Sequence, residues 1–405
     1  MNRIIKLAIP VALAHLLTAA AGFVDTLMSG RAGVADLAGV ALGSAFWLTL
    51  VIAPMGLFIA INPIVGQYAG AKNYPAITNF LHQSVRVAFV VALLLLIILN
   101  LRDWYLPLII DDKDVVRVTS DYLQGFAWGV PALLGTFVLR SYSEGLSFTR
   151  PDMVASTVSL LINIPANYAL IFGHWGAPEM GGAGAGWATA IAFWAAFLVM
   201  VLFSLHHKVY ARANIWRNFS RFDRNELRHL LKVGMPVAMT MFVEVSIFSL
   251  IALFLGGRPS VEIAAHQVAM NVSYLAFTLP LSISVAATIR VSMKVGAGNI
   301  KQARQAAKAA VLLALITASM NIFILVMFAD VIARLYSNDS EVISMAAHLL
   351  MFAAMFQLAD AFVVPTQGAL RGYKDTTIPL LLAILAYWVV ALPLGYLLGL
   401  TDVIT

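Results

Sequence analysis

Eleven apolar runs, each long enough to cross a bilayer as a helix, fill most of this 405-residue chain. They lie at about 4–28, 37–68, 84–101, 120–145, 154–173, 184–205, 231–255, 263–293, 308–330, 342–368 and 378–399. A bilayer core takes about 20 residues of helix, whereas barrel strands would alternate in polarity over about ten residues. Only 11% of the residues are charged, against about 25% in soluble domains. The chain is therefore predicted to be an all-α polytopic membrane protein.

The distribution of positive charge predicts the orientation. Assigning the N-terminus and every second loop to one side collects 20 of the 26 Lys and Arg residues there. Because cytoplasmic loops carry an excess of Lys and Arg, we expect a cytoplasmic N-terminus. The net charge of +6 is then explained by topology and not by nucleic-acid binding. The absence of cysteine excludes disulfides and thiolate metal sites.

The second half of the sequence repeats the first. At an offset of 226 residues, Pro10 matches Pro236, Pro54 matches Pro280, Gly70 matches Gly296 and Asn73 matches Asn299. Further on, an offset of 223 pairs Gly145 with Gly368 and Asp152 with Asp375. Six helices precede the second copy, so both copies enter the membrane in the same direction, as in carriers with parallel repeats.

The repeat predicts two homologous six-helix bundles around a central cleft, the second apparently without its last helix. We expect an N-terminal bundle at 1–205, a cytoplasmic linker at 206–230 and a C-terminal bundle at 231–405. A twelfth helix matching 184–205 is expected from the repeat, yet the sequence stops soon after the eleventh. The chain is either natively short or a fragment.

Three carboxylates lie inside apolar runs: Asp25, Glu244 and Asp360. Each costs about 2.5–3.5 kcal/mol on insertion scales, so each is expected to have a function. No Lys or Arg is expected at the same depth, which leaves protons or cations to neutralise them. The plainer alternative is that each acid is protonated and hydrogen-bonded to a neighbouring helix.

Several polar or helix-breaking residues could support a cation site. Asn163 and Asn167 share a helix face. Their amide groups suit a cation site and helix–helix hydrogen bonding equally well. Pro10 and Pro236 break corresponding helices, as hinges or as static kinks. His15 is expected to be a packing residue, and the acidic run 111–114 a solvated turn.

Six motifs give this sequence a resemblance to a known family. They are Gly22-Phe23-Val24-Asp25-Thr26, Ile162-Asn163-Ile164-Pro165-Ala166-Asn167-Tyr168, Gly176-Ala177-Pro178-Glu179, Phe242-Val243-Glu244, Ala264-Ala265-His266-Gln267-Val268-Ala269 and Leu370-Arg371-Gly372-Tyr373-Lys374-Asp375. Along essentially its whole length the chain resembles the multidrug and toxic compound extrusion (MATE) transporters, in particular the NorM-type branch.

The resemblance implies export of organic cations against Na⁺ or H⁺ entry across a bacterial inner membrane. Asp25, Glu244 and Asp360 match the acids that carry the coupling ion, with Na⁺ at Glu244 and Asp360 as a hypothesis. Glu244 and Asn167 favour the NorM-type branch, and Gln267 belongs to one of the shared motifs. Phe356 is a departure, because NorM-type members commonly carry a Tyr there. Members are also longer by about one helix.

The sequence thus predicts an ion-coupled antiporter with no cofactor, most simply a monomer, whose partners are organic cation drugs and dyes, Na⁺ or H⁺ and the bilayer. A lipid-linked oligosaccharide flippase is the nearer alternative, but its cavity should be richer in Arg and Lys. An intramembrane prenyl or glycosyl transferase is the enzymatic alternative. It would need paired Asp-rich motifs, and the run 111–114 has no partner.

Overall fold

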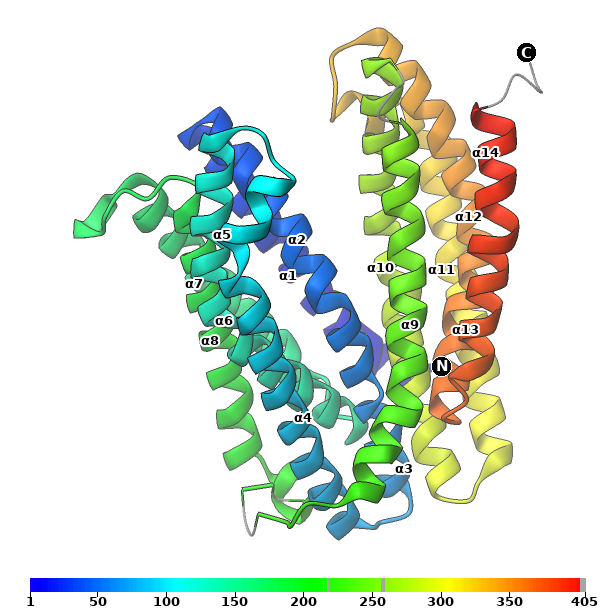
Figure 1. The fold of residues 1–405 in the computed structure, drawn as a ribbon. Helices are drawn as coiled ribbons and strands as arrows, with labels where there is room; N and C mark the ends of the chain where they lie inside the picture. The colour runs from blue at the N-terminus through cyan, green and yellow to red at the C-terminus, as the bar shows by residue number, and fades with distance from the viewer. Residues whose placement is uncertain (214, 217–218, 256–258, 401–405) are drawn as a thin grey trace. The chain divides into compact units, whose positions relative to one another are not determined.

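The described part of the chain in the computed structural model comprises residues 1–213, 215–216, 219–255 and 259–400, and its regular elements are all helices (Figure 1). By length and composition, eleven of these helices could cross a membrane. This confirms the predicted all-α membrane class. Within this total, α2 and α3 form one span from Val34 to Gly70, and the last span runs from Thr377 to Leu397.

Contacts divide the chain into two compact units. The N-terminal unit comprises Leu13–Ala238, and the C-terminal unit comprises Met1–Ala12 together with the residues from Met239 onward. Helix α1 (Asn2–Ala32) therefore passes from one unit to the other after Ala12, and α9 (Arg224–Leu255) does so after Ala238. These two points lie two residues beyond Pro10 and Pro236, in the interior of continuous helices.

The helices of the N-terminal unit follow α1 in chain order. They are α2 (Val34–Ile59), α3 (Ile61–Gly70), α4 (Tyr74–Asn100), α5 (Arg102–Tyr105), η1 (Leu106–Leu108), α6 (Lys113–Gly145), α7 (Arg150–Phe172), η2 (His174–Gly176), α8 (Ala183–His206) and η3 (Lys208–Ala213), and the start of α9 closes the unit.

Glycines in α6 bring α8 into close contact with it. A Cβ at Gly125 would lie 2.6 Å from the backbone nitrogen of Trp187, and one at Gly129 would lie 2.8 Å from the Cα of Ala190. Small residues allow the backbones of membrane helices to approach closely. The packing of α8 against α6 therefore depends on glycine along one face of α6.

The C-terminal unit contains the end of α9 and six further regular segments. They are α10 (Ser260–Gly296), α11 (Ile300–Arg334), α12 (Ser340–Gly372), α13 (Thr377–Ala383), the π-helix η4 (Ile384–Ala391) and α14 (Leu392–Leu400). Helices α10, α11 and α12 pack on one another (Figure 1). Alanine, valine and leucine side chains form most of this core, including Ala354 and Leu350 from α12.

The structure supports the internal repeat and corrects its register in the later helices. Asn73 caps α4 by accepting from Ala76 N at 3.2 Å, and Asn299 caps α11 by accepting from Gln302 N at 3.0 Å, which keeps the offset of 226. Asp112 and Asp339 cap α6 and α12, and both of these helices span 33 residues. The offset there is therefore 227, and the pairing of Gly145 with Gly368 at 223 is wrong.

Matching turns after α6 and α12 confirm this register. Ser147 and Lys374 both adopt a left-handed conformation, with φ of 60° and 65°. Gly145 packs against Val65 and Gly372 packs against Val291, the repeat partner of Val65. Asp360 therefore corresponds to Leu133, and the sequence-based pairing with Phe137 is corrected.

The segment between the halves is fastened to the N-terminal unit. Buried His82 donates from Nε2 to the carbonyl of Ile215 at 2.7 Å, and its Nδ1 accepts from Ser220 N at 3.0 Å. Tyr142 donates to the carbonyl of Ala213. Burial raises the pKa of Tyr210 to about 12. Arg217, which belongs to the predicted linker, and Arg258 and residues 401–405, which belong to the predicted C-terminal bundle, lie outside the described residues.

Candidate functional site

Asp25 lies in a buried cage of hydrogen-bond donors in the N-terminal unit. Its Oδ1 accepts from Asn163 Nδ2 at 3.0 Å and from Asn167 Nδ2 at 2.6 Å. Its Oδ2 accepts from the hydroxyl of Thr189 at 3.0 Å. The carboxyl is only 8% exposed. This arrangement unites three of the predicted site residues, and three donors can stabilise the charged form of the acid.

The local sequence explains the cage. Asn163 and Asn167 are four residues apart on α7, so their side chains stand one above the other, and Asn167 also donates to Asn163 Oδ1 at 3.0 Å. The remaining amide oxygen, Asn167 Oδ1, is buried, and no described residue forms a hydrogen bond with it. The sequence did not lead us to predict Thr189 as a site residue. The feature that could have identified it is its hydroxyl within the apolar run of α8.

Glu244 lies on α9 in the C-terminal unit, beside two residues of α12. Gln367 donates a hydrogen bond to the Glu244 carboxylate, and the charge of Arg371 acts on it. Arg371 in turn donates from Nη2 to Ser284 Oγ at 3.0 Å. The expectation that no Lys or Arg lies near the membrane acids is therefore wrong for Glu244. Gln367 and Arg371 are four residues apart, so both face the same side of α12.

Asp360 also lies on α12, seven residues before Gln367, and is half-buried. Among the described residues it has neither a hydrogen-bond partner nor an ion-pair partner, although its charge reaches Glu244. The structure thus brings the two predicted acids of the C-terminal unit into electrostatic contact. Of the three acids, Asp360 is thus the one for which the described residues provide neither a hydrogen-bond donor nor an ion-pair partner.

Tyr387 is a further polar residue that the sequence did not predict. The charges of both Glu244 and Asp360 act on its phenol. Tyr387 lies in the π-helix η4, and π-helical turns are frequent at functional sites. Its hydroxyl is the kind of oxygen that Phe356, exposed on α12, lacks.

The remaining predicted residues lie apart from these clusters. Gln267 is exposed on α10 and, within the described ranges, makes no hydrogen bond to Glu244 or Asp360. His15 on α1 faces Arg140 at 3.2 Å. Asp112 is a helix cap, as expected for a solvated turn. The described residues hold no group of three or more His, Cys, Asp or Glu side chains suited to a metal.

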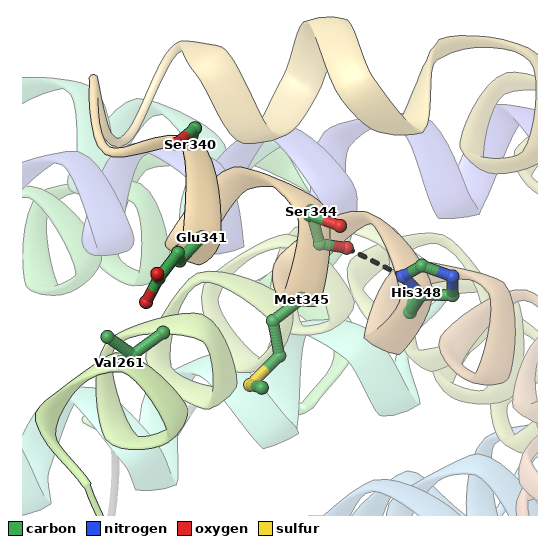
Figure 2. Close-up of a pocket in the computed structure, with 6 residues that line it drawn as sticks. All are labelled: Val261, Ser340, Glu341, Ser344, Met345 and His348. Carbon is green, nitrogen blue, oxygen red and sulfur yellow. Dashed lines mark hydrogen bonds between the residues drawn. The ribbon is translucent and has the colours of Figure 1, made fainter.

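A surface pocket of about 560 Å³ lies at the other end of α12 (Figure 2). Figure 2 shows Glu341, Met345 and His348 projecting from successive turns of α12, with Val261 of α10 opposite. His348 Nδ1 donates to the carbonyl of Ser344 at 2.8 Å. His348 precedes Asp360 by 12 residues, or about 18 Å of helix. The pocket is therefore separate from the acids.

The fold defines a polytopic helical membrane protein made of two repeated units, each with acids inside its helices. A family model described as MatE matches residues 10–169 and again residues 236–397. The chain therefore belongs to the MatE family. The two matches begin 226 residues apart, which is the offset of the internal repeat.

Curated relatives and solved structures agree with this assignment. The chain is 38% identical over 401 residues to the probable multidrug resistance protein NorM of Idiomarina loihiensis, covering 99% of this chain and 87% of the relative. It is 40% identical over 402 residues to the multidrug resistance protein MdtK of Yersinia pseudotuberculosis, covering 99% and 88%. The crystal structure of the eukaryotic MATE transporter AtDTX14 has the same fold, with a TM-score of 0.85, 22% identity, and coverage of 98% of this chain and 88% of that one.

Proposed function

We propose that this protein is a secondary antiporter that exports organic cations and drugs in exchange for Na⁺ or H⁺ by alternating access. The names of its relatives support multidrug efflux. The family consists of transporters, so we assign no catalytic residues and no cofactor beyond the coupling ion. The acidic side chains inside the helices of the two units support the coupling to an ion.

The observation that carries this proposal is the unequal pairing of the three acids. Asp25 accepts three hydrogen bonds. Glu244 accepts one from Gln367 and is acted on by the charge of Arg371, whereas Asp360 has no partner among the described residues. Opposite charge stabilises a carboxylate. The positive charge of a cation or proton bound at Asp360 therefore also acts on the Glu244 carboxylate. It competes there with the positive charge of Arg371. The same negative charge attracts an organic cation, which the coupling ion displaces.

The helices divided between the units support alternating access. Both α1 and α9 change units two residues after an internal proline, and proline removes a backbone hydrogen bond from the helix interior. We assign Pro10 and Pro236 as the hinges. The Lys and Arg distribution supports a cytoplasmic N-terminus in a bacterial inner membrane, and we take the monomer as the working unit.

The test is ethidium movement in proteoliposomes containing the full chain. An inward Na⁺ gradient at constant pH is compared with an inward H⁺ gradient without Na⁺. We expect gradient-driven extrusion, and the gradient that drives it identifies the coupling ion. Silence under both gradients, in protein that is folded and inserted, would contradict the proposed activity.

Asp360→Asn and Glu244→Gln test the site itself. Each variant removes one carboxylate charge at almost constant volume, so we expect ethidium exchange to fall to the background of empty liposomes while insertion is unchanged. Glu341→Gln is the matched control, because Glu341 lies on the same helix at the start of α12, remote from the acids. If both site variants expel ethidium at the wild-type rate under the same gradient, the mechanism is wrong.

A further inference from the structure

A buried charged cluster in the N-terminal unit plays no part in the function proposed above. Arg140 and Glu144 of α6 lie beside Asp152 of α7, with Nε of Arg140 3.2 Å from Glu144 Oε1 and 3.2 Å from Asp152 Oδ2. Asn62 of α3 donates from Nδ2 to Glu144 Oε2 at 2.9 Å. Glu144 is 5% exposed and Asp152 is 3% exposed. The cluster therefore holds two carboxylates that are almost completely removed from solvent.

The charges in this cluster do not balance. Among the residues that the structure describes, Arg140 is the one positive group that acts on both Glu144 and Asp152. His15 of α1, which is also titratable, presents Nε2 to Arg140 Nη2 at 3.2 Å. Because a guanidinium only donates, Nε2 of His15 accepts this hydrogen bond and carries no proton of its own in the contact. Two carboxylates thus face one guanidinium, which leaves one uncompensated negative charge.

Two buried oxygen atoms in the cluster lack donors. Asp152 Oδ2 is within ion-pair distance of Arg140, but within the described part of the chain neither this atom nor Asn62 Oδ1 has a hydrogen-bond partner. Buried acceptors of this kind are rarely left unsatisfied. A proton on one of the two carboxyl groups supplies the missing donor and removes the surplus charge in one step.

We propose that Glu144 and Asp152 together hold one exchangeable proton, which makes this cluster a proton-binding site separate from Asp25, Glu244 and Asp360. The proton comes from water, and the O–H bond forms on one carboxylate while the other remains paired with Arg140. Arg140 also contacts His15, three residues beyond the point where α1 passes between the units. The site therefore lies directly beside α1.

Infrared difference spectroscopy of the purified full chain tests this proposal, because a protonated carboxyl has a C=O stretching band that a carboxylate lacks. Either Asp152→Asn or Glu144→Gln leaves one carboxylate matched by Arg140. We therefore expect each single variant to lose the same band, equal to one carboxyl per chain. Asp114→Asn is the control, since Asp114 is 72% exposed, and it should leave the spectrum unchanged.

The two variants together keep the test decisive. Both substitutions keep the side-chain volume, and a single variant that retains the wild-type melting temperature is sufficient. A band that persists at full intensity in that variant would overturn the proposal. Should neither variant fold, Arg140→Gln provides the second measurement, since it leaves two unmatched carboxylates and we expect the band to double. An unchanged band in Arg140→Gln would equally overturn it. The readout does not involve transport, so it is independent of the antiport proposal.

Discussion

The same helix position carries different chemistry in the two units. The α6 glycines that admit α8 are Gly125, Gly129 and Gly135, and their partners at an offset of 227 are Phe352, Phe356 and Phe362 of α12. These three phenylalanines are 63%, 68% and 54% exposed among the described residues. Between α6 and α12 the repeat has thus preserved the helix length and the aspartate cap while replacing a close-packing face with an aromatic one.

The charged residues differ in the same way. Glu144 of α6 corresponds to Arg371 of α12, and Thr18 of α1 corresponds to Glu244 of α9. In both units a Glu and an Arg interact within the helices, but the acid comes from α6 in one unit and from α9 in the other. Backbone geometry is therefore the shared property of the repeat, and the sites are properties of each unit.

The largest expected effect on stability separates the buried ion pairs of Arg140 from a surface pair. Arg140→Leu would leave the buried carboxylates of Glu144 and Asp152 without their cation, and removing one partner of a buried pair costs about 3–5 kcal/mol. Arg117→Leu is the control, because its pair with Asp114 is 72% exposed on both sides and is worth about 0–1 kcal/mol. Denaturant unfolding of the detergent-purified variants measures both. Equal losses would show that the cluster is not buried as described.

The glycine face can be tested by exchanging residues between the units. Gly129→Phe introduces the residue that α12 has at the equivalent position, and its Cβ alone would lie 2.8 Å from Ala190 Cα. We expect a loss of about 1–3 kcal/mol through overpacking. Phe356→Ala in α12 should stay within about 0.5 kcal/mol, as exposed positions do. If Phe356→Ala costs as much as Gly129→Phe, the aromatic face is packed against another segment.

Much of the fold was predictable because it depends on local properties. Apolar runs fixed the eleven spans, and Asn163 and Asn167 were placed on one face by their spacing alone. The influence of the Arg371 charge on Glu244 was not predictable, since it depends on which faces of α9 and α12 meet. Tyr387 was missed because a π-helix shifts the register of side chains. The pairing at an offset of 223 was wrong because it relied on two chance matches. The matching helix caps, which give the offset of 227, were not recognised in the sequence.

The phenol of Tyr387 can be tested by a single-atom change. Tyr387→Phe removes one oxygen that lies within electrostatic reach of Glu244 and Asp360. We expect the apparent affinity for the coupling ion in ethidium exchange to fall about tenfold, equivalent to about 1.4 kcal/mol, with little change in the maximal rate. Tyr396→Phe is the matched control, because Tyr396 is exposed and contacts Phe254 through its ring. Equal affinities in both variants would exclude Tyr387 from the site.

The smallest expected effect concerns the linker, which exists in one copy and is attached to the N-terminal unit. A hydrogen bond from Asn79 Nδ2 at 2.8 Å, supported by the backbone N–H of Asn225, holds the pKa of Asp223 below its ordinary value of 3.8. A lowered folded-state pKa contributes stability above the ordinary value, and this contribution disappears as the pH falls through the folded pKa. Asp223→Asn should therefore slightly reduce the dependence of the unfolding midpoint on pH below about 5. Asn79→Ala should reduce it in the same direction, because the same hydrogen bond is lost. Identical pH profiles in wild type and both variants would show that this contact is not maintained in solution, and that the linker depends on His82 and Tyr142 for its attachment.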